Sequence, residues 1–140
     1  MKATDLRVGN LVNTNRAHGR GEKQIKAVEI NLHYLAQIEN NCNYIEPILL
    51  TEEWLLKFEF TEEIQYYSDT LSYFWLDIHN SLENSEFYIF YNTEIKCIGL
   101  HSMENEHNIS KYFYNIKYVH QLQNLYFALT NNELTLNKTI

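Results

Sequence analysis

Aromatic residues crowd the segment from residue 71 to residue 101, and this crowding constrains the fold more than any other feature of the sequence. The segment contains Tyr73-Phe74-Trp75 and then Phe87 to Tyr91, with polar turn residues at 80–84 and at Asn92-Thr93. Strands bounded by such turns are rich in aromatic and β-branched residues. The sequence therefore predicts a three-stranded antiparallel meander over residues 71–101.

Both faces of this predicted sheet carry aromatic side chains. Phe87, Ile89 and Tyr91 fall on one face of the second strand, whereas Tyr88 and Phe90 fall on the other. Such a sheet is either covered on both sides, or covered on one side and used for binding on the other. Aromatic residues make up 14% of the chain, with 11 Tyr, a content that suits an interface as well as a core. The sequence leaves both interpretations open.

The segment before this sheet predicts an N-terminal β-roll over residues 6–46, which we expect to be SH3-like. Apolar residues at 8–12 and at 25–30 are typical of two strands that pair across a polar loop. Residues 32–38 alternate between apolar and polar types, which predicts a third strand. A short edge segment ends at Pro47, because proline cannot donate a hydrogen bond to a sheet.

Two predicted helices complete an α+β fold. Residues 51–58 predict a short helix, with Thr51 as its cap and acidic residues in its first turn. Residues 119–130 predict a longer helix, because apolar residues recur at helical spacing at Val119, Leu122, Leu125, Tyr126 and Leu129. We expect this apolar stripe to pack on the meander and Gln123 to face solvent.

The chain length of 140 residues is typical of one domain, and we predict a single compact domain over residues 1–140. No apolar run approaches the roughly 18 residues of a membrane span. The first residues lack the apolar core of a secretory signal, so we expect a cytoplasmic protein. Cys42 and Cys97 fit no zinc or redox spacing and are expected to be free thiols.

The formal net charge of −7 is unevenly distributed. Residues 27–106 hold fifteen acidic and two basic residues, a charge of −13, whereas residues 1–26 carry +4. A net acidic protein is a poor general binder of nucleic acid, because phosphate contacts supply most of that affinity. An alternative function, a nucleic-acid accessory role, would use the basic hairpin with Arg16, His18, Arg20, Lys23 and Lys26.

The densest set of potential metal ligands is the segment 101–107, with His101, Glu104 and His107. The spacing of its two histidines fits neither a helix face nor a zinc knuckle, so we expect a solvated polar loop without metal. The sequence also lacks a phosphate-binding loop and a nucleophile elbow. We therefore predict no catalytic residue and no cofactor, and a small metal-dependent hydrolase is the least favoured function.

Three blocks of the sequence resemble a family of small uncharacterised bacterial proteins carried on phages and mobile elements. The blocks are residues 6–12 (LRVGNLV), 48–58 (ILLTEEWLLKF) and 116–130 (IKYVHQLQNLYFALT), and their order spans most of the chain. The resemblance implies an accessory role and no enzymatic activity. It favours a non-enzymatic interaction module, whose partner is another protein or a second copy of this chain.

The chain departs from the family pattern at two positions where the family often has glycine. These positions are Glu59, after the first predicted helix, and Asn131, after the second. Both glycine positions suit a left-handed cap at a helix end. Asn131 is a mild change, whereas Glu59 argues against a sharp end to the first helix.

Overall fold

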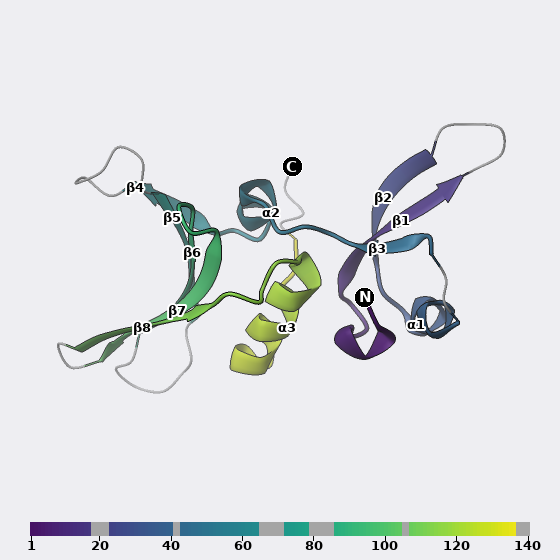
Figure 1. Ribbon diagram of the computed structural model, residues 1–140. Helices are drawn as coiled ribbons and strands as arrows, with labels where there is room; N and C mark the ends of the chain where they lie inside the picture. The colour runs from purple at the N-terminus through teal and green to yellow at the C-terminus, as the bar shows by residue number, and fades with distance from the viewer. Residues whose placement is uncertain (18–22, 41–42, 65–71, 79–85, 105–106, 137–140) are drawn as a thin grey trace. The chain divides into compact units, whose positions relative to one another are not determined.

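A computed structural model of the chain describes residues 1–17, 23–40, 43–64, 72–78, 86–104 and 107–136 (Figure 1). The α+β class is confirmed, because helices accompany a three-stranded and a five-stranded sheet. The contacts within the chain divide it into two compact units, and the single domain over residues 1–140 stays a prediction. The first contains Met1–Leu50 and Tyr118–Leu134, and the second contains Thr51–Lys117 and Thr135–Ile140.

The first unit is built on an antiparallel sheet with the strand order β2-β1-β3. Its strands are β1 (Leu11–Ala17), β2 (Lys23–Glu29) and β3 (Ile45–Pro47), and a short 3-10 helix, η1 (Ala3–Asp5), precedes them. β3 is an edge strand that ends at Pro47, as the sequence predicts. The SH3-like character of this segment stays a prediction.

The strand predicted over residues 32–38 is wrong, because Leu32–Glu39 form the helix α1. The side chain of Asn31 caps this helix by accepting a hydrogen bond of 3.0 Å from the backbone N–H of Tyr34. Ile38 packs into the core, whereas Leu32, which the alternation places on the same face, is 76% exposed. Tyr34 and Ile38 are four residues apart, a spacing that places them on one face of a helix and also on one face of a strand. This short pattern therefore fits a helix as well as a strand.

The long helix α3 spans Val119–Thr130, which are the predicted bounds. It belongs to the first unit, where it contacts β1, and the packing of its apolar stripe on the meander stays a prediction. Val119 and Leu122 are fully buried, whereas the larger apolar residues of its second half are half-buried. Asn131 ends the helix in the left-handed conformation, with φ of 57°.

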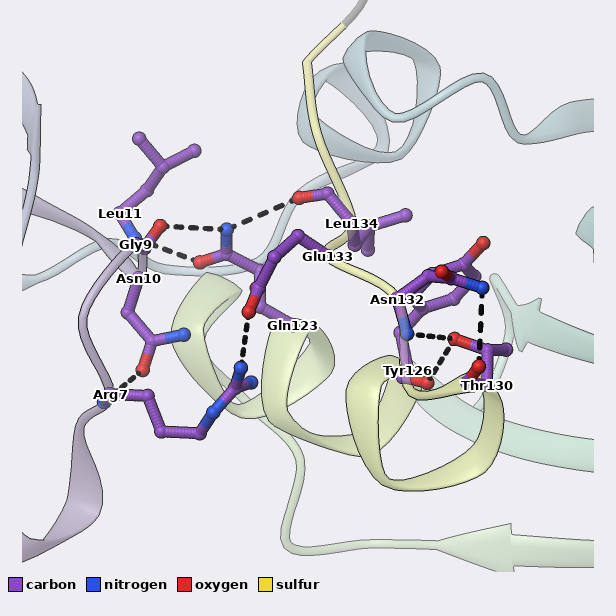
Figure 2. A network of polar contacts seen from close by, with 10 residues as sticks. All are labelled: Arg7, Gly9, Asn10, Leu11, Gln123, Tyr126, Thr130, Asn132, Glu133 and Leu134. Atoms are coloured by element: carbon purple, nitrogen blue, oxygen red, sulfur yellow. Dashed lines mark hydrogen bonds and ion pairs between the residues drawn. The ribbon is translucent and has the colours of Figure 1, made fainter.

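The prediction that Gln123 of α3 faces solvent is wrong, because its side chain is only 2% exposed. Figure 2 shows the amide between two segments that flank the helix. Its Oε1 accepts a hydrogen bond of 2.8 Å from the backbone N–H of Leu11, and its Nε2 donates one of 3.3 Å to the carbonyl of Leu134. These bonds satisfy the buried amide and join the start of β1 to the chain after α3.

The second unit is built on an antiparallel sheet with the strand order β4-β5-β6-β7-β8 (Figure 1). The predicted meander is confirmed as β5 (Ser72–Asp77), β6 (Glu86–Asn92) and β7 (Cys97–Glu104). The sequence missed the two outer strands, which are β4 (Thr61–Ile64) and β8 (His107–Phe113). In the segment 101–107, which we expected to be a loop, the described residues belong to the end of β7 and the start of β8.

The short helix α2 (Glu52–Lys57) begins after Thr51, but Thr51 makes no side-chain capping bond, contrary to the prediction. The helix ends sharply, because Glu59 adopts φ of 66°. The backbone N–H groups of Glu59 and Phe60 donate to the carbonyls of Leu56 and Leu55, at 3.0 and 3.1 Å. This is a Schellman motif, so glutamate occupies the position that glycine favours.

The core of the second unit uses one face of its sheet. Residues at alternate positions point to the same face, and directly paired residues share it. One face holds the buried side chains of Phe74, Ile89 and Ile98. Leu55 and Phe58, from α2 and its end, are buried as well.

Candidate functional site: the aromatic face of the five-stranded sheet

The other face of the five-stranded sheet carries a continuous set of rings, which we call the aromatic face. Strand register assigns its members to one side, because Trp75 pairs with Phe90, Phe90 with Gly99, and Gly99 with Tyr112. Neighbouring ring centroids lie between 5.3 and 6.5 Å apart, within the range of favourable aromatic contacts. The rings of this face are those of Tyr73, Trp75, Tyr88, Phe90, His101 and Tyr112.

Phe90 is the centre of the aromatic face, and Gly99 makes room for its ring. Phe90 is 2% exposed and contacts the rings of Tyr73, Trp75 and Tyr112. A Cβ atom on Gly99 would lie 2.3 Å from the Phe90 ring. The glycine thus lets an aromatic ring lie directly over the backbone of the neighbouring strand, where it supports the surrounding rings.

The outer rings of this face remain accessible to solvent. Tyr73, Trp75 and Tyr88 are half-buried, Tyr112 is 36% exposed and Tyr114, which stacks on it, is 70% exposed. The sequence left open whether these aromatic residues form a core or an interface, and the structure contains rings in both kinds of environment. Phe90 is buried like a core residue, whereas the rings around it offer a surface.

The aromatic face contains a pocket of about 250 Å³, lined by Glu63, Trp75, Tyr88 and His101. These four residues come from the four successive strands β4, β5, β6 and β7. The Trp75 ring stands at 89° to that of Tyr88 and at 78° to that of His101. The pocket thus has aromatic walls that meet nearly at right angles and a carboxylate contributed by the outer strand.

The polar groups of the pocket are unevenly satisfied. The Nδ1 atom of His101 lies 2.9 Å from the Oγ of Ser110, a contact that fixes the orientation of the ring. The indole N–H of Trp75 is buried and finds no acceptor in the described part of the chain. Glu63 is exposed, and no described lysine or arginine pairs with it. A buried donor without an acceptor, such as the indole N–H of Trp75, is rare in folded proteins and calls for an explanation.

The second unit carries a strong negative charge around this pocket. Residues 51–117 contain twelve acidic and four basic residues, a formal charge of −8. By register, Asp77 lies on the same face as Glu63, because it pairs with Tyr88. The aromatic face therefore attracts cations and repels phosphates and carboxylates.

The described geometry offers little support for nucleophilic catalysis on this face. Cys97 is a free thiol on the same side of the sheet, but burial raises its pKa, so it is protonated at neutral pH. Burial also raises the pKa of Tyr112, with a further contribution from Tyr73 and Tyr114. The structure thus supplies aromatic surface and a carboxylate, which are features of recognition.

Strand register describes the backbone positions of the three candidate metal ligands, and the side chains of Glu104 and His107 lie outside the described part of the chain. His101 pairs with Ser110, whereas Glu104 pairs with His107 at the end of the hairpin between β7 and β8. Among the described residues, no group of three histidine, cysteine or acidic residues could hold a metal ion.

The basic hairpin falls partly outside the described residues. His18 and Arg20 lie outside them, and only the backbone is described for Arg16 and Lys23, at the ends of β1 and β2. Lys26 is exposed on β2. The nucleic-acid alternative therefore stays a prediction from the sequence.

Comparisons with protein-family models, with curated proteins and with solved structures each found no match to this chain. Within the described ranges, none of the helices has the length and apolar character of a membrane span. The case for function rests on the aromatic face alone.

Proposed function

We propose that the protein is a non-enzymatic interaction module, and that it binds a basic protein partner on the aromatic face of its five-stranded sheet. The observation that carries this proposal is the difference between the two faces. One face carries the buried side chains of Phe74, Ile89 and Ile98, whereas the other presents Trp75, Tyr88 and Tyr112 at its surface. Tyrosine and tryptophan are the residues that dominate binding energy at protein interfaces.

Charge selects the class of partner. The formal charge of −8 on residues 51–117, together with Glu63 and Asp77 on the aromatic face, favours a positively charged surface and speeds its approach. The same charge opposes an RNA or DNA ligand at this face. A role in a phage or mobile element, as the sequence resemblance implies, remains a proposal that rests on that resemblance.

Site-specific photo-crosslinking tests this function. A benzophenone amino acid in place of Tyr112 probes the aromatic face, and the same group in place of Lys111, the exposed neighbour on β8, probes the opposite face. After irradiation of cells that express the protein, we expect an adduct from position 112 alone, weakened by Tyr114→Ser. Mass spectrometry should identify the crosslinked peptide as part of a basic segment.

Three outcomes contradict the proposal. Equal adducts from positions 112 and 111 would show non-specific contact. An adduct with an acidic protein would refute the electrostatic argument. An adduct with a second copy of this chain would instead establish a homodimer through the aromatic face.

A further inference from the structure

We infer that the pocket between Glu63, Trp75, Tyr88 and His101 takes the guanidinium group of an arginine side chain from the partner. This inference rests on the proposed function and names the group that the aromatic face recognises. The pocket of about 250 Å³ has room for one long side chain. Its walls are rings, and the charge at its rim is the carboxylate of Glu63.

The aromatic walls favour a cation. The negative face of an aromatic ring attracts a positive group within about 6 Å of its centroid. Trp75, the best ring for this contact, is half-buried and lines the pocket beside Tyr88. A neutral apolar ligand would gain the same burial but would leave Glu63 without a counter-charge.

The carboxylate distinguishes guanidinium from ammonium. Guanidinium is planar, so it stacks on one ring while its edge donates hydrogen bonds to a carboxylate. Because the Trp75 ring is almost perpendicular to the rings of Tyr88 and His101, one wall can stack on the guanidinium plane while another contacts its edge. A lysine ammonium would keep the charge but lose the stacking and the forked hydrogen bonds.

The first unit of the protein already contains an arrangement of this kind. Arg7 lies with its Cζ atom 3.6 Å from the centroid of the Phe127 ring, and its Nη2 pairs with the carboxylate of Glu133. Figure 2 shows the pairing of Arg7 with Glu133. An aromatic ring and a nearby carboxylate thus hold an arginine elsewhere in this chain. The pocket of the aromatic face supplies the ring and the carboxylate, but no described arginine fills it.

The indole N–H proton of Trp75 provides a direct probe in nuclear magnetic resonance spectra. The chain has two tryptophans, so Trp54→Phe assigns the signal. Titration with N-acetyl-arginine amide should shift this signal saturably, with a dissociation constant on the order of 10 mM, because only one side chain is bound. The lysine analogue should bind more weakly, and the uncharged citrulline analogue should cause no saturable shift.

Two matched variants locate the carboxylate contact. Glu63→Gln should raise the dissociation constant about fivefold, because it removes the charge but keeps the shape. Glu62→Gln should leave it unchanged, since Glu62 is equally exposed but pairs with Phe74 on the opposite face. Both residues are exposed, so neither change is expected to unfold the protein.

The inference is overturned if arginine amide causes no saturable shift up to about 100 mM, ten times the expected constant. It is also overturned if citrulline or lysine amide binds as well as arginine amide, or if the two glutamate variants weaken binding equally. Crosslinks from the benzophenone at position 112 without arginine binding would refute this inference and leave the proposed function standing. Arginine binding without any crosslink would refute the proposed function and leave the arginine-binding pocket standing.

Discussion

The Phe90 ring lies over the backbone of Gly99, on the strand next to its own, so closely that a Cβ atom there would approach the ring to 2.3 Å. Phe90 has little freedom to move, because the rings of Trp75 and Tyr112 pack against it at 5.3 and 5.4 Å. The glycine is therefore part of the aromatic face, although it contributes no side chain. Glycine is required at this position because the Phe90 ring lies so close to the backbone, and not because of the backbone conformation.

Gly99→Ala should lower the free energy of unfolding by about 1–3 kcal/mol, the usual cost of overpacking a tight contact. Urea denaturation measures this loss. The double variant Gly99→Ala/Phe90→Leu should lose less than the sum of the two single changes, because the smaller side chain relieves the clash. Strictly additive losses would show that Gly99 and Phe90 do not interact in this way.

Gln123→Ala should destabilise the protein by about 2–4 kcal/mol, because it leaves the buried N–H of Leu11 without an acceptor and opens a cavity. The matched control is Asn132→Ala, at an exposed position after α3, which should change stability by less than about 0.5 kcal/mol. Urea denaturation of both variants checks the difference. A loss below about 1 kcal/mol at Gln123 would mean that water replaces its hydrogen bonds.

The helix α3 shows which features a sequence pattern predicts and which it does not. The bounds of α3 were predictable because its apolar residues recur over three turns, but Gln123 was assigned to solvent by its polarity alone. Gln123 follows Val119 by four residues, which is the spacing of one helix face, and its burial depends on acceptors and donors far along the chain. Polarity therefore misplaces a residue whose hydrogen bonds are long-range.

The candidate site was predictable in part. Aromatic residues on both faces of the meander left two interpretations open, a sheet covered on both sides or one with a face used for binding, and the structure leaves the rings of one face partly accessible. The pocket was not predictable, because it depends on the register that sets four strands side by side. Its carboxylate comes from β4, a strand that the sequence did not indicate, since Thr61–Ile64 contains two adjacent glutamates.

Glu59→Gly should stabilise the protein by about 0.5–1 kcal/mol. Glutamate is sterically strained at φ of 66°. The free energy of this strain exceeds the entropic free-energy cost of ordering a flexible glycine on folding. Glu59→Ala is the control, because alanine also carries a Cβ atom and should give no gain. Thermal denaturation compares the three proteins, and equal stability of the glycine and alanine variants would contradict the steric argument.

His120 should make stability depend on pH. Its side chain is 3% exposed, and its Nδ1 is buried without a partner among the described residues. Burial lowers its pKa below the usual 6.5, with a smaller contribution from the N-terminal amine and an opposing one from Asp5. The folded protein therefore holds a neutral imidazole.

As the pH falls below about 6.5, the unfolded chain binds a proton at His120 that the folded chain does not, so stability should decrease with acid until the lower folded pKa is reached. Urea denaturation at about pH 7.5 and about pH 5.5 measures the loss. His120→Phe, which can keep the stacking on Tyr118, should lose less stability over this interval than the unchanged protein. His33→Gln, at an exposed position of α1, serves as the control and should keep the full dependence. If His120→Phe also keeps it, the acid sensitivity arises from another group.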